Sequence, residues 1–355
     1  MGQKLDNSEN YIATCQKSKH QTYEEEACNG RKQFCEKKFN KFTFPGAHNA
    51  GTGQKDNPNF SCFYKNQDLN VREQLDFGLR FLDLDVIYNE GGNCNGLETG
   101  TFNKIAQPKS ISAVAQNFFI ALQIAGHGAF TFLYQCMGSL KHYFQEVKKW
   151  MEENQREVVI VHLGELKNRD EVIDHFQRLL SCVYPSDKGI NTHFQETGKW
   201  PTLGEAISSE KQLFVMVKFK KAELLGNDDI QRKYIKVLKV KDESLKESLP
   251  KGTISMISAY KSGYVGDNCI QRVQMVEKKC QELQADFVKV PAYGTLTNDA
   301  ICLHHVAEEC NSRIPQILNA CKKHKDVVNF VFADYPNHLG LSHYTLPEIT
   351  ENENL

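Results

Sequence analysis

Short apolar runs recur along this 355-residue chain, and stretches with helical periodicity separate them. The runs are rich in β-branched and aromatic residues, which predicts strands. We expect seven of them, near residues 41–45, 79–88, 158–163, 212–219, 253–260, 286–292 and 328–335. Several are nearly continuous in apolar residues, as is typical of parallel strands that are covered on both faces. The pattern places no eighth strand.

Helical patterns fill the intervals between these strands. Glu205 follows Thr202 by three residues, the spacing of a capping box at a helix start, and residues 300–321 give another long helix. One helix is marked by apolar residues that recur at helical spacing: Leu140, Phe144, Val147 and Met151. Strands that alternate with helices over this length predict a parallel α/β fold, either a (β/α) barrel or a doubly wound sheet.

The positions of the polar residues favour the barrel. Five of them fall at or just past the carboxyl ends of predicted strands: His48, Asp83, Asp85, Glu165 and Asp334. In a (β/α) barrel those ends share one face, which is where active sites lie. A doubly wound sheet would instead spread them along a line.

Residues 111–137 contain no lysine, arginine, aspartate or glutamate, and the segment is long enough to span a bilayer. However, Gln116, Asn117, Gln123 and His127 interrupt it, and each polar group would be costly in lipid. We therefore expect a buried helix followed by a strand. A patch that dips into a membrane surface is the alternative.

The composition is that of a globular protein, with 25% charged residues and a net charge of -1, so no basic excess indicates a nucleic-acid partner. Twelve cysteines without a CxxC pair indicate disulfides in an oxidising compartment, and buried free thiols in a cytosolic protein are the alternative. Asn59-Phe60-Ser61 is a glycosylation acceptor that agrees with secretion. The first ten residues lack the apolar core of a leader, so the protein is either cytosolic or a mature chain whose leader has been removed. The cysteines favour the second, and we expect a secreted protein.

Two segments carry the candidate chemistry, FPGAHNAGTG at residues 44–53 and GLRFLDLDV at residues 78–86. In the first, small residues surround His48 and leave room for a ligand to approach the backbone. In the second, Asp83 and Asp85 face the same side of a strand, so inside a barrel they need a cation or an arginine. A hard cation such as Ca²⁺ or Mg²⁺ suits these oxygen ligands. A solvated pair at a strand end is the alternative.

Transfer of a phosphoryl group with a departing alcohol needs a second general catalyst. His127, which lies between two glycines, is the candidate general acid, and a histidine packed in an apolar segment is the alternative. His162 alternates with apolar residues and is expected in the core or behind the site.

Five motifs occur in an order that resembles a known family. They are FPGAHNAGTG, REQLDFGLRFLDLDV, a histidine-glycine ahead of SLKHYFQEVKKWMEENQREVVIVHL, WPTLGEAI and VVNFVFADYPN. The chain resembles, from about residue 42 to 337, the catalytic X domain of phosphatidylinositol-specific phospholipase C and its single-domain secreted relatives. The resemblance implies a distorted TIM-type barrel over residues 41–345. Residues 1–40 would be a cysteine-bearing N-terminal extension packed on it, and residues 346–355 a C-terminal tail.

The resemblance also implies residue roles. His48 would be the base, His127 the general acid, Arg80 the group that stabilises the phosphate charge, and Asp334 the residue that orients the base. The His48-Asn49 pair resembles the Ca²⁺-dependent form of the family, which implies a metal site. In that form a carboxylate ligand is expected directly after the run VVIVHL, and here Glu165 stands one position later. The expected ligands are Asn49, Asp83, Asp85 and Glu165, with Mg²⁺ as the second metal and a metal-free route left open.

The expected function is cleavage of a phosphatidylinositol- or GPI-like lipid at a membrane surface, through a cyclic phosphate, by a monomer peripheral to the membrane. A metal-dependent sphingomyelinase D-like or glycerophosphodiesterase activity is one alternative, and a catalytically inactive barrel that acts as a binding protein is another. Lys218, Tyr260 and Lys261 follow predicted strands at the mouth of the barrel and are candidate contacts to the headgroup, or else ordinary rim residues.

Overall fold

The computed structural model describes residues 26–53, 66–90, 120–127, 134–166, 170–185, 188–219, 238–242, 253–258, 269–282, 285–292, 304–337 and 345–355. The strands are β1 Phe44–Ala47, β2 Phe81–Glu90, β3 Ile120–His127, β4 Tyr134–Ser139, β5 Val159–Leu166, β6 Leu213–Phe219, β7 Leu238–Asp242, β8 Thr253–Ser258, β9 Phe287–Ala292 and β10 Phe330–Ala333. The α-helices are α2 Val71–Asp76, α3 Leu140–Glu153, α4 Asp170–Val183, α5 His193–Thr197, α6 Leu203–Ser208, α8 Cys269–Glu282, α9 His304–Asn311, α10 Ile314–Lys322 and α11 Leu346–Asn354. Three short 3₁₀ helices are η1 Lys32–Glu36, η2 Phe39–Lys41 and η3 Ala50–Gly53.

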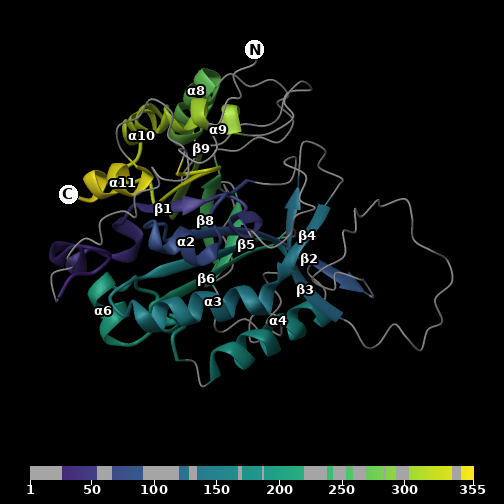
Figure 1. Ribbon diagram of the computed structural model, residues 1–355. Coiled ribbons are helices and arrows are strands. Elements are labelled where there is room, and N and C mark those ends of the chain that lie inside the picture. Colours follow the sequence, from purple (N-terminus) through teal and green to yellow (C-terminus); the bar gives the residue numbers. More distant parts are fainter. Residues whose placement is uncertain are drawn as a thin grey trace, which may run out of the picture.

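The central feature is a closed ring of parallel strands. Within the described residues, eight strands follow the order β1-β10-β9-β8-β7-β6-β5-β2, and β2 pairs with β1 to close the ring. This is the (β/α) barrel expected from the sequence, and β7 is the eighth strand that the apolar pattern did not place. β3 and β4 are antiparallel and extend the sheet from β2 at one side of the barrel (Figure 1).

Three segments differ from the sequence-based expectation. Residues 120–127 form strand β3 instead of a helix, because they pair with the long upper part of β2. The helix expected over residues 300–321 is broken between α9 and α10, where Pro315 sits in the first turn of α10. The last ten residues, expected as a C-terminal tail, contain helix α11, which begins with a capping box at Thr345 and packs against β1.

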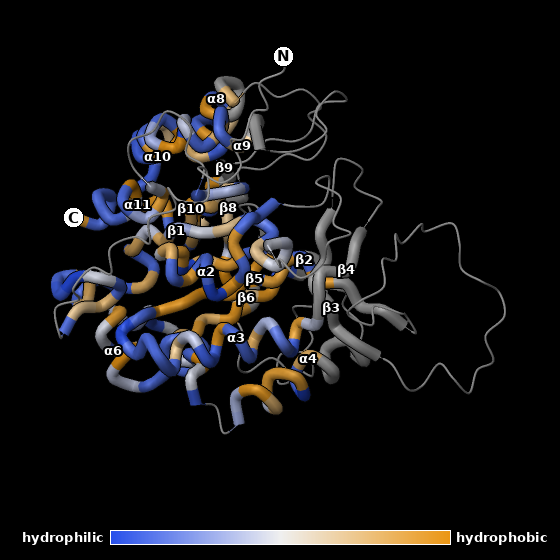
Figure 2. Tube along the Cα trace, viewed as in Figure 1, coloured by the Kyte–Doolittle hydropathy of each residue, from blue (hydrophilic) through white to orange (hydrophobic). Residues whose placement is uncertain are grey.

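Residues of the strands face alternately into the barrel and toward the helices. On β2, Phe81 belongs to the apolar cluster inside the barrel, whereas Leu82 and Leu84 pack between the strands and the helices. The inner cluster is rich in phenylalanine and includes Phe44, Phe214, Phe287, Phe330 and Phe332. Figure 2 shows hydrophobic β5 and β6 beside α3, on which hydrophilic and hydrophobic residues alternate.

The described part of the N-terminal segment covers the amino-terminal end of the barrel. Phe39 of η2 stacks on Phe214 with 3.8 Å between ring centroids, and on Trp200 at 5.4 Å. A disulfide joins Cys28 to Cys35. This apolar plug fills the end of the barrel that is opposite the carboxyl ends of the strands.

Disulfides also join the helices before β9 and β10. Cys269 pairs with Cys310, and Cys280 pairs with Cys321, so that α8 is linked near both ends to α9 and α10. The expectation of disulfides is confirmed for these cysteines, while Cys182 is a free, exposed thiol. No helix among the described residues is long and apolar enough to cross a bilayer.

Candidate active site

The site begins with a buried histidine–carboxylate pair at the carboxyl ends of two neighbouring strands. His48 follows β1 and Asp334 follows β10, and these strands pair in register from Phe44 to Ala47. The Nδ1 atom of His48 lies 2.7 Å from Oδ1 of Asp334, and both side chains are buried. A carboxylate at Nδ1 orients the ring and leaves Nε2 as the nitrogen that can accept a proton.

The turn after β1 is held by amide side chains from the segment before α2. Gln67 is fully buried, and its Nε2 donates to the carbonyls of His48 at 2.6 Å and Ala333 at 3.0 Å. It therefore joins the strand ends that carry the two members of the pair. Asn49 adopts a left-handed conformation with φ of 47°, which asparagine tolerates well, and its amide donates to Asn66.

A further amide fixes the backbone on the other side of the pair. Asn311, the last residue of α9, is buried and donates to the carbonyl oxygens of Asp334 at 2.9 Å and Tyr335 at 3.2 Å. Tyr335 has a positive φ of 45°, a conformation that bulky residues rarely adopt. The chain therefore turns sharply at Asp334 and is held there from two sides, because the Tyr335 amide also donates to the Asn66 carbonyl.

Asp83 lies inside the barrel, on β2, with two basic partners. Its Oδ1 atom lies 2.5 Å from Nδ1 of His162 on β5 and 3.3 Å from Nζ of Lys289 on β9. Burial opposes ionisation of this carboxyl, but the charges of Lys289 and His162 outweigh it and hold the pKa of Asp83 well below its usual range. Asp83 is thus an ionised carboxylate that already has one cationic partner, Lys289, and a histidine on the same oxygen.

The Ca²⁺ site expected from the sequence is not supported. Asp83 is engaged by Lys289 and His162, and Asn49 turns its amide nitrogen to Asn66. Across the described ranges, no group of three or more histidine, cysteine, aspartate or glutamate side chains is arranged to hold a metal ion. Asp85 is half-buried, and its carboxylate lies close to the backbone of Gly164 on β5. A Cβ atom at position 164 would lie only 2.7 Å from Oδ1 of Asp85.

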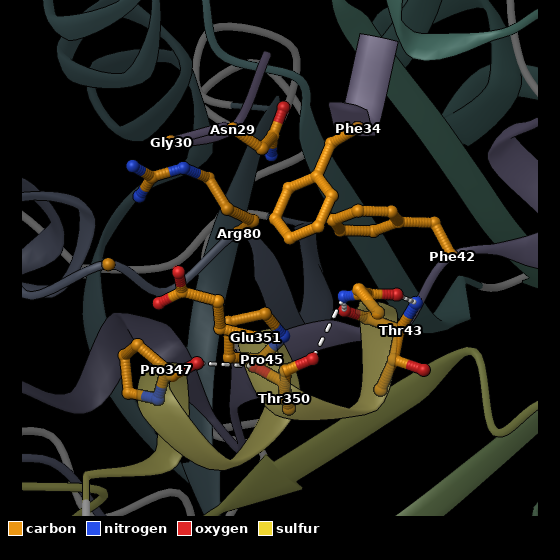
Figure 3. Close-up of a pocket in the computed structure, with 12 residues that line it drawn as sticks. Asn29, Gly30, Phe34, Phe42, Thr43, Pro45, Arg80, Pro347, Thr350 and Glu351 are labelled. Atoms are coloured by element: carbon orange, nitrogen blue, oxygen red, sulfur yellow. Dashed lines mark hydrogen bonds between the residues drawn. The ribbon is translucent and has the colours of Figure 1, made fainter. Parts of the chain in front are cut away.

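The structure places Arg80 away from His48. Arg80 precedes β2 and faces outward, where its Nε donates to Glu157 at 2.8 Å and its guanidinium lies 4.7 Å from the ring centre of Trp150. It lines a small cavity of about 80 Å³ together with Phe34 and Glu351 (Figure 3). This cavity lies at the amino-terminal ends of β1 and β2, so Arg80 is not near the His48–Asp334 pair, beside which it was expected to stabilise the phosphate charge.

Replacement of Arg80 by methionine is expected to lower stability and leave turnover nearly unchanged. The change leaves Glu157 as a buried, unpaired carboxylate, which costs about 3–5 kcal/mol in the free energy of unfolding. Denaturant titration measures this loss, and assays at a temperature where the variant stays folded measure turnover. A folded variant with normal stability and a hundredfold lower kcat would restore the phosphate-binding role expected from the sequence.

For most of the other expected site residues, the structure describes only the backbone or the residue lies outside the described ranges. His127 is the last residue of β3, and β3 contacts η3, directly after the His48 turn; only its backbone is described. Glu165 lies in β5 with its backbone alone described. Lys218 is half-buried near the end of β6, on the same strand face as Met216, which lies in the inner cluster. Tyr260 and Lys261 lie outside the described residues.

The sequence reasoning missed Lys289 and Gln67. Lys289 stands in the run FVKVPA, where a lysine at an inward position between apolar residues was the available signal. Gln67 lies in a polar stretch before α2, and nothing in its neighbourhood distinguishes it from an exposed glutamine. His162 was expected in the core or behind the site, and it lies there, 1% exposed.

Comparisons with known proteins agree with this fold. A family model described as PI-PLC X 1 matches residues 129–256, a range that includes neither His48 nor Asp334. PI-PLC X domain-containing protein 1 from Arthroderma benhamiae is 26% identical over 211 residues, which cover 58% of this chain and 55% of that protein. The chain therefore spans about half the length of this curated relative.

Two bacterial enzymes have similar structures. Phosphatidylinositol-specific phospholipase C from Staphylococcus aureus has a TM-score of 0.54 at 13% identity, with 89% of this chain and 94% of that chain covered. The enzyme of the same name from Listeria monocytogenes has a TM-score of 0.52 at 12% identity, with coverage of 90% and 95%. At such low identity this likeness shows the fold.

Proposed function

The chain resembles the X-domain proteins of phosphatidylinositol-specific phospholipase C in sequence and in fold, and we propose that it is a phosphodiesterase that cleaves phosphatidylinositol or a related glycolipid. The observation that carries the proposal is the buried His48–Asp334 pair at the carboxyl ends of β1 and β10. In a (β/α) barrel this face is where catalytic groups lie. The three described disulfides support a site of action in an oxidising compartment. Cleavage of the proposed lipid substrate would take place at a membrane surface.

In the proposed reaction, Nε2 of His48 takes the proton from the inositol hydroxyl next to the phosphate ester. The hydroxyl oxygen then forms a bond to phosphorus, and the bond from phosphorus to the diacylglycerol oxygen breaks. A cyclic inositol phosphate and a diacylglycerol result. Asp334 stabilises the imidazolium that forms on His48, because its carboxylate lies 2.7 Å from Nδ1.

The departing diacylglycerol oxygen needs a proton, and we assign its delivery to His127. The support is the backbone of β3, which pairs with β2 as far as Ala125, opposite Asp85, and ends two residues later at His127. β3 also contacts η3, the turn that follows His48 and Asn49. General acid assistance of this kind is typically worth about 10²–10⁴-fold in rate.

Product analysis tests the proposal. The full chain is incubated with vesicles of phosphatidylinositol or of sphingomyelin, and both the lipid and the water-soluble products are identified. We expect diacylglycerol and cyclic inositol phosphate from the first and no product from the second. Phosphatidate or a cyclic lipid phosphate would show cleavage on the headgroup side, as in the sphingomyelinase D-like alternative. Vesicle binding without turnover would favour the catalytically inactive barrel.

A further inference from the structure

Asp83 and Lys289 form a charged pair in the interior of the barrel, immediately below the proposed base. Asp83 is 8% exposed and Lys289 is 7% exposed, so both charges are largely withdrawn from water. Buried charges persist in proteins when they are paired and hydrogen-bonded. The 3.3 Å contact between Lys289 Nζ and Asp83 Oδ1, with His162 on the same oxygen, meets this condition.

The ring of Phe332 lies between this pair and the proposed base, His48. Lys289 Nζ lies 4.7 Å from the ring centre of Phe332, a distance at which a cation is attracted by the face of an aromatic ring. The ring of His48 packs against the same phenylalanine, edge to face, with 5.8 Å between centroids. The ammonium of Lys289 is therefore a cation built into the floor of the candidate site, separated from His48 by one aromatic ring.

A metal ion at Asp83 would compete with this ammonium. Both are cations that would bind the same carboxylate, and in a poorly solvated interior two like charges a few ångströms apart repel strongly. The pairing of β9 with β8 and β10 fixes the backbone of Lys289, and its buried ammonium lies between Asp83 and the ring of Phe332. The sequence of β2 predicts that Asp83 needs a cationic partner. In the structure this partner is the side chain of Lys289.

We propose that Lys289 is the resident cation of this site, in the place against Asp83 where a divalent metal would bind, so that the site works without Ca²⁺. The part of this inference that concerns turnover rests on the proposed phosphodiesterase function. The part that concerns ion binding does not, because occupancy of Asp83 by Lys289 predicts how the folded chain responds to Ca²⁺ whether or not it has a substrate.

Calorimetric titration with CaCl₂ tests the inference in four full-length proteins, the wild type and three variants. They are the wild type, Lys289→Met, Asp83→Asn and the matched double variant Asp83→Asn/Lys289→Met, in which neither charge remains. We expect no Asp83-dependent binding in the wild type, Ca²⁺ binding in Lys289→Met and none in the double variant. Thermal unfolding gives a second readout, with a rise of about 2 °C in the Tm of Lys289→Met at about ten times Kd.

Two outcomes would overturn the inference. The first is wild-type protein that binds Ca²⁺ and loses this binding in Asp83→Asn, a result that needs no Lys289 variant to fold. The second is folded Lys289→Met, as judged by circular dichroism, that binds Ca²⁺ no better than the wild type. If Lys289→Met does not fold, Lys289→Gln, which can still hydrogen-bond to Asp83, replaces it in the series.

Turnover gives an arm that is separate from ion binding. With phosphatidylinositol vesicles, we expect the wild type to keep its rate within about twofold in excess chelator, and Lys289→Arg to retain more activity than Lys289→Met. A rate that falls tenfold in chelator and returns with Ca²⁺ would overturn the inference while supporting the proposed function. A chain with no turnover on any lipid would fail the proposed function, and the titrations would still decide the role of Lys289.

Discussion

Substitution of His48 by alanine is expected to lower kcat on phosphatidylinositol about 10³-fold or more. The imidazole is the group that takes the proton of the attacking hydroxyl, and a positioned general base typically contributes about 10²–10⁴-fold. Substrate binding does not depend on this proton transfer, so KM should change far less than kcat. Initial rates at several vesicle concentrations separate the two constants.

The matched control for this variant is His142→Ala. His142 is an exposed histidine on α3, so its loss removes the same side chain from a position outside the site. We expect its kcat to equal that of the wild type. Equal activity of His48→Ala and His142→Ala, in protein that unfolds at the normal Tm, would show that His48 is not the base. This result would favour the alternative of a catalytically inactive barrel that acts as a binding protein.

Substitution of Asp334 by asparagine is expected to lower kcat about 10²–10³-fold with little change in KM. Asparagine has nearly the same shape as aspartate, so the hydrogen bonds that Asn311 makes to the backbone at 334 and 335 can persist. What the variant lacks is the negative charge beside Nδ1 of His48, which stabilises the imidazolium formed during the reaction. Steady-state kinetics on vesicles measures both constants.

The double variant His48→Ala/Asp334→Asn shows whether the two residues act as a pair. If Asp334 works through His48, its loss should add almost nothing once His48 is gone, because residues that act as a unit are not additive. Fully multiplicative losses would mean that Asp334 acts on another part of the reaction. Thermal unfolding of each variant separates this effect from general loss of structure.

Much of the barrel is predictable from the pattern of apolar residues, and the exceptions have physical reasons. β7 was missed because LKVKD is short and alternates apolar and charged residues, whereas strands such as β6, LFVMVKF, are nearly continuous apolar runs. β3 was expected to be helical because a short apolar run fits both a helix and a strand. The edge of β2 decides this case: β3 pairs with it from Asp85 to Glu90.

The candidate site shows where sequence reasoning reaches its limit. Two carboxylates on one strand face correctly predict that Asp83 needs a cationic partner, but not which one. The nearest basic residue along the chain, Arg80, has the opposite strand parity and binds Glu157 outside the barrel. Lys289 lies 206 residues from Asp83 and reaches it only because the ring closes. The pairing of His48 with Asp334 also joins residues far apart in the sequence, through the pairing of β1 with β10.

The two cystines that tie α8 to α9 and α10 bear on how the protein should be produced. In a reducing bacterial cytosol these thiols would not pair, and the strands after the helices, β9 and β10, would depend on noncovalent packing alone. Lys289 lies in β9 and Asp334 directly follows β10. In protein from such a host, a loss of activity caused by misfolding could not be distinguished from the loss of a catalytic group. Export to the periplasm or secretion from a eukaryotic cell, with thiol counting on the purified product, gives the preparation in which enzymology has meaning.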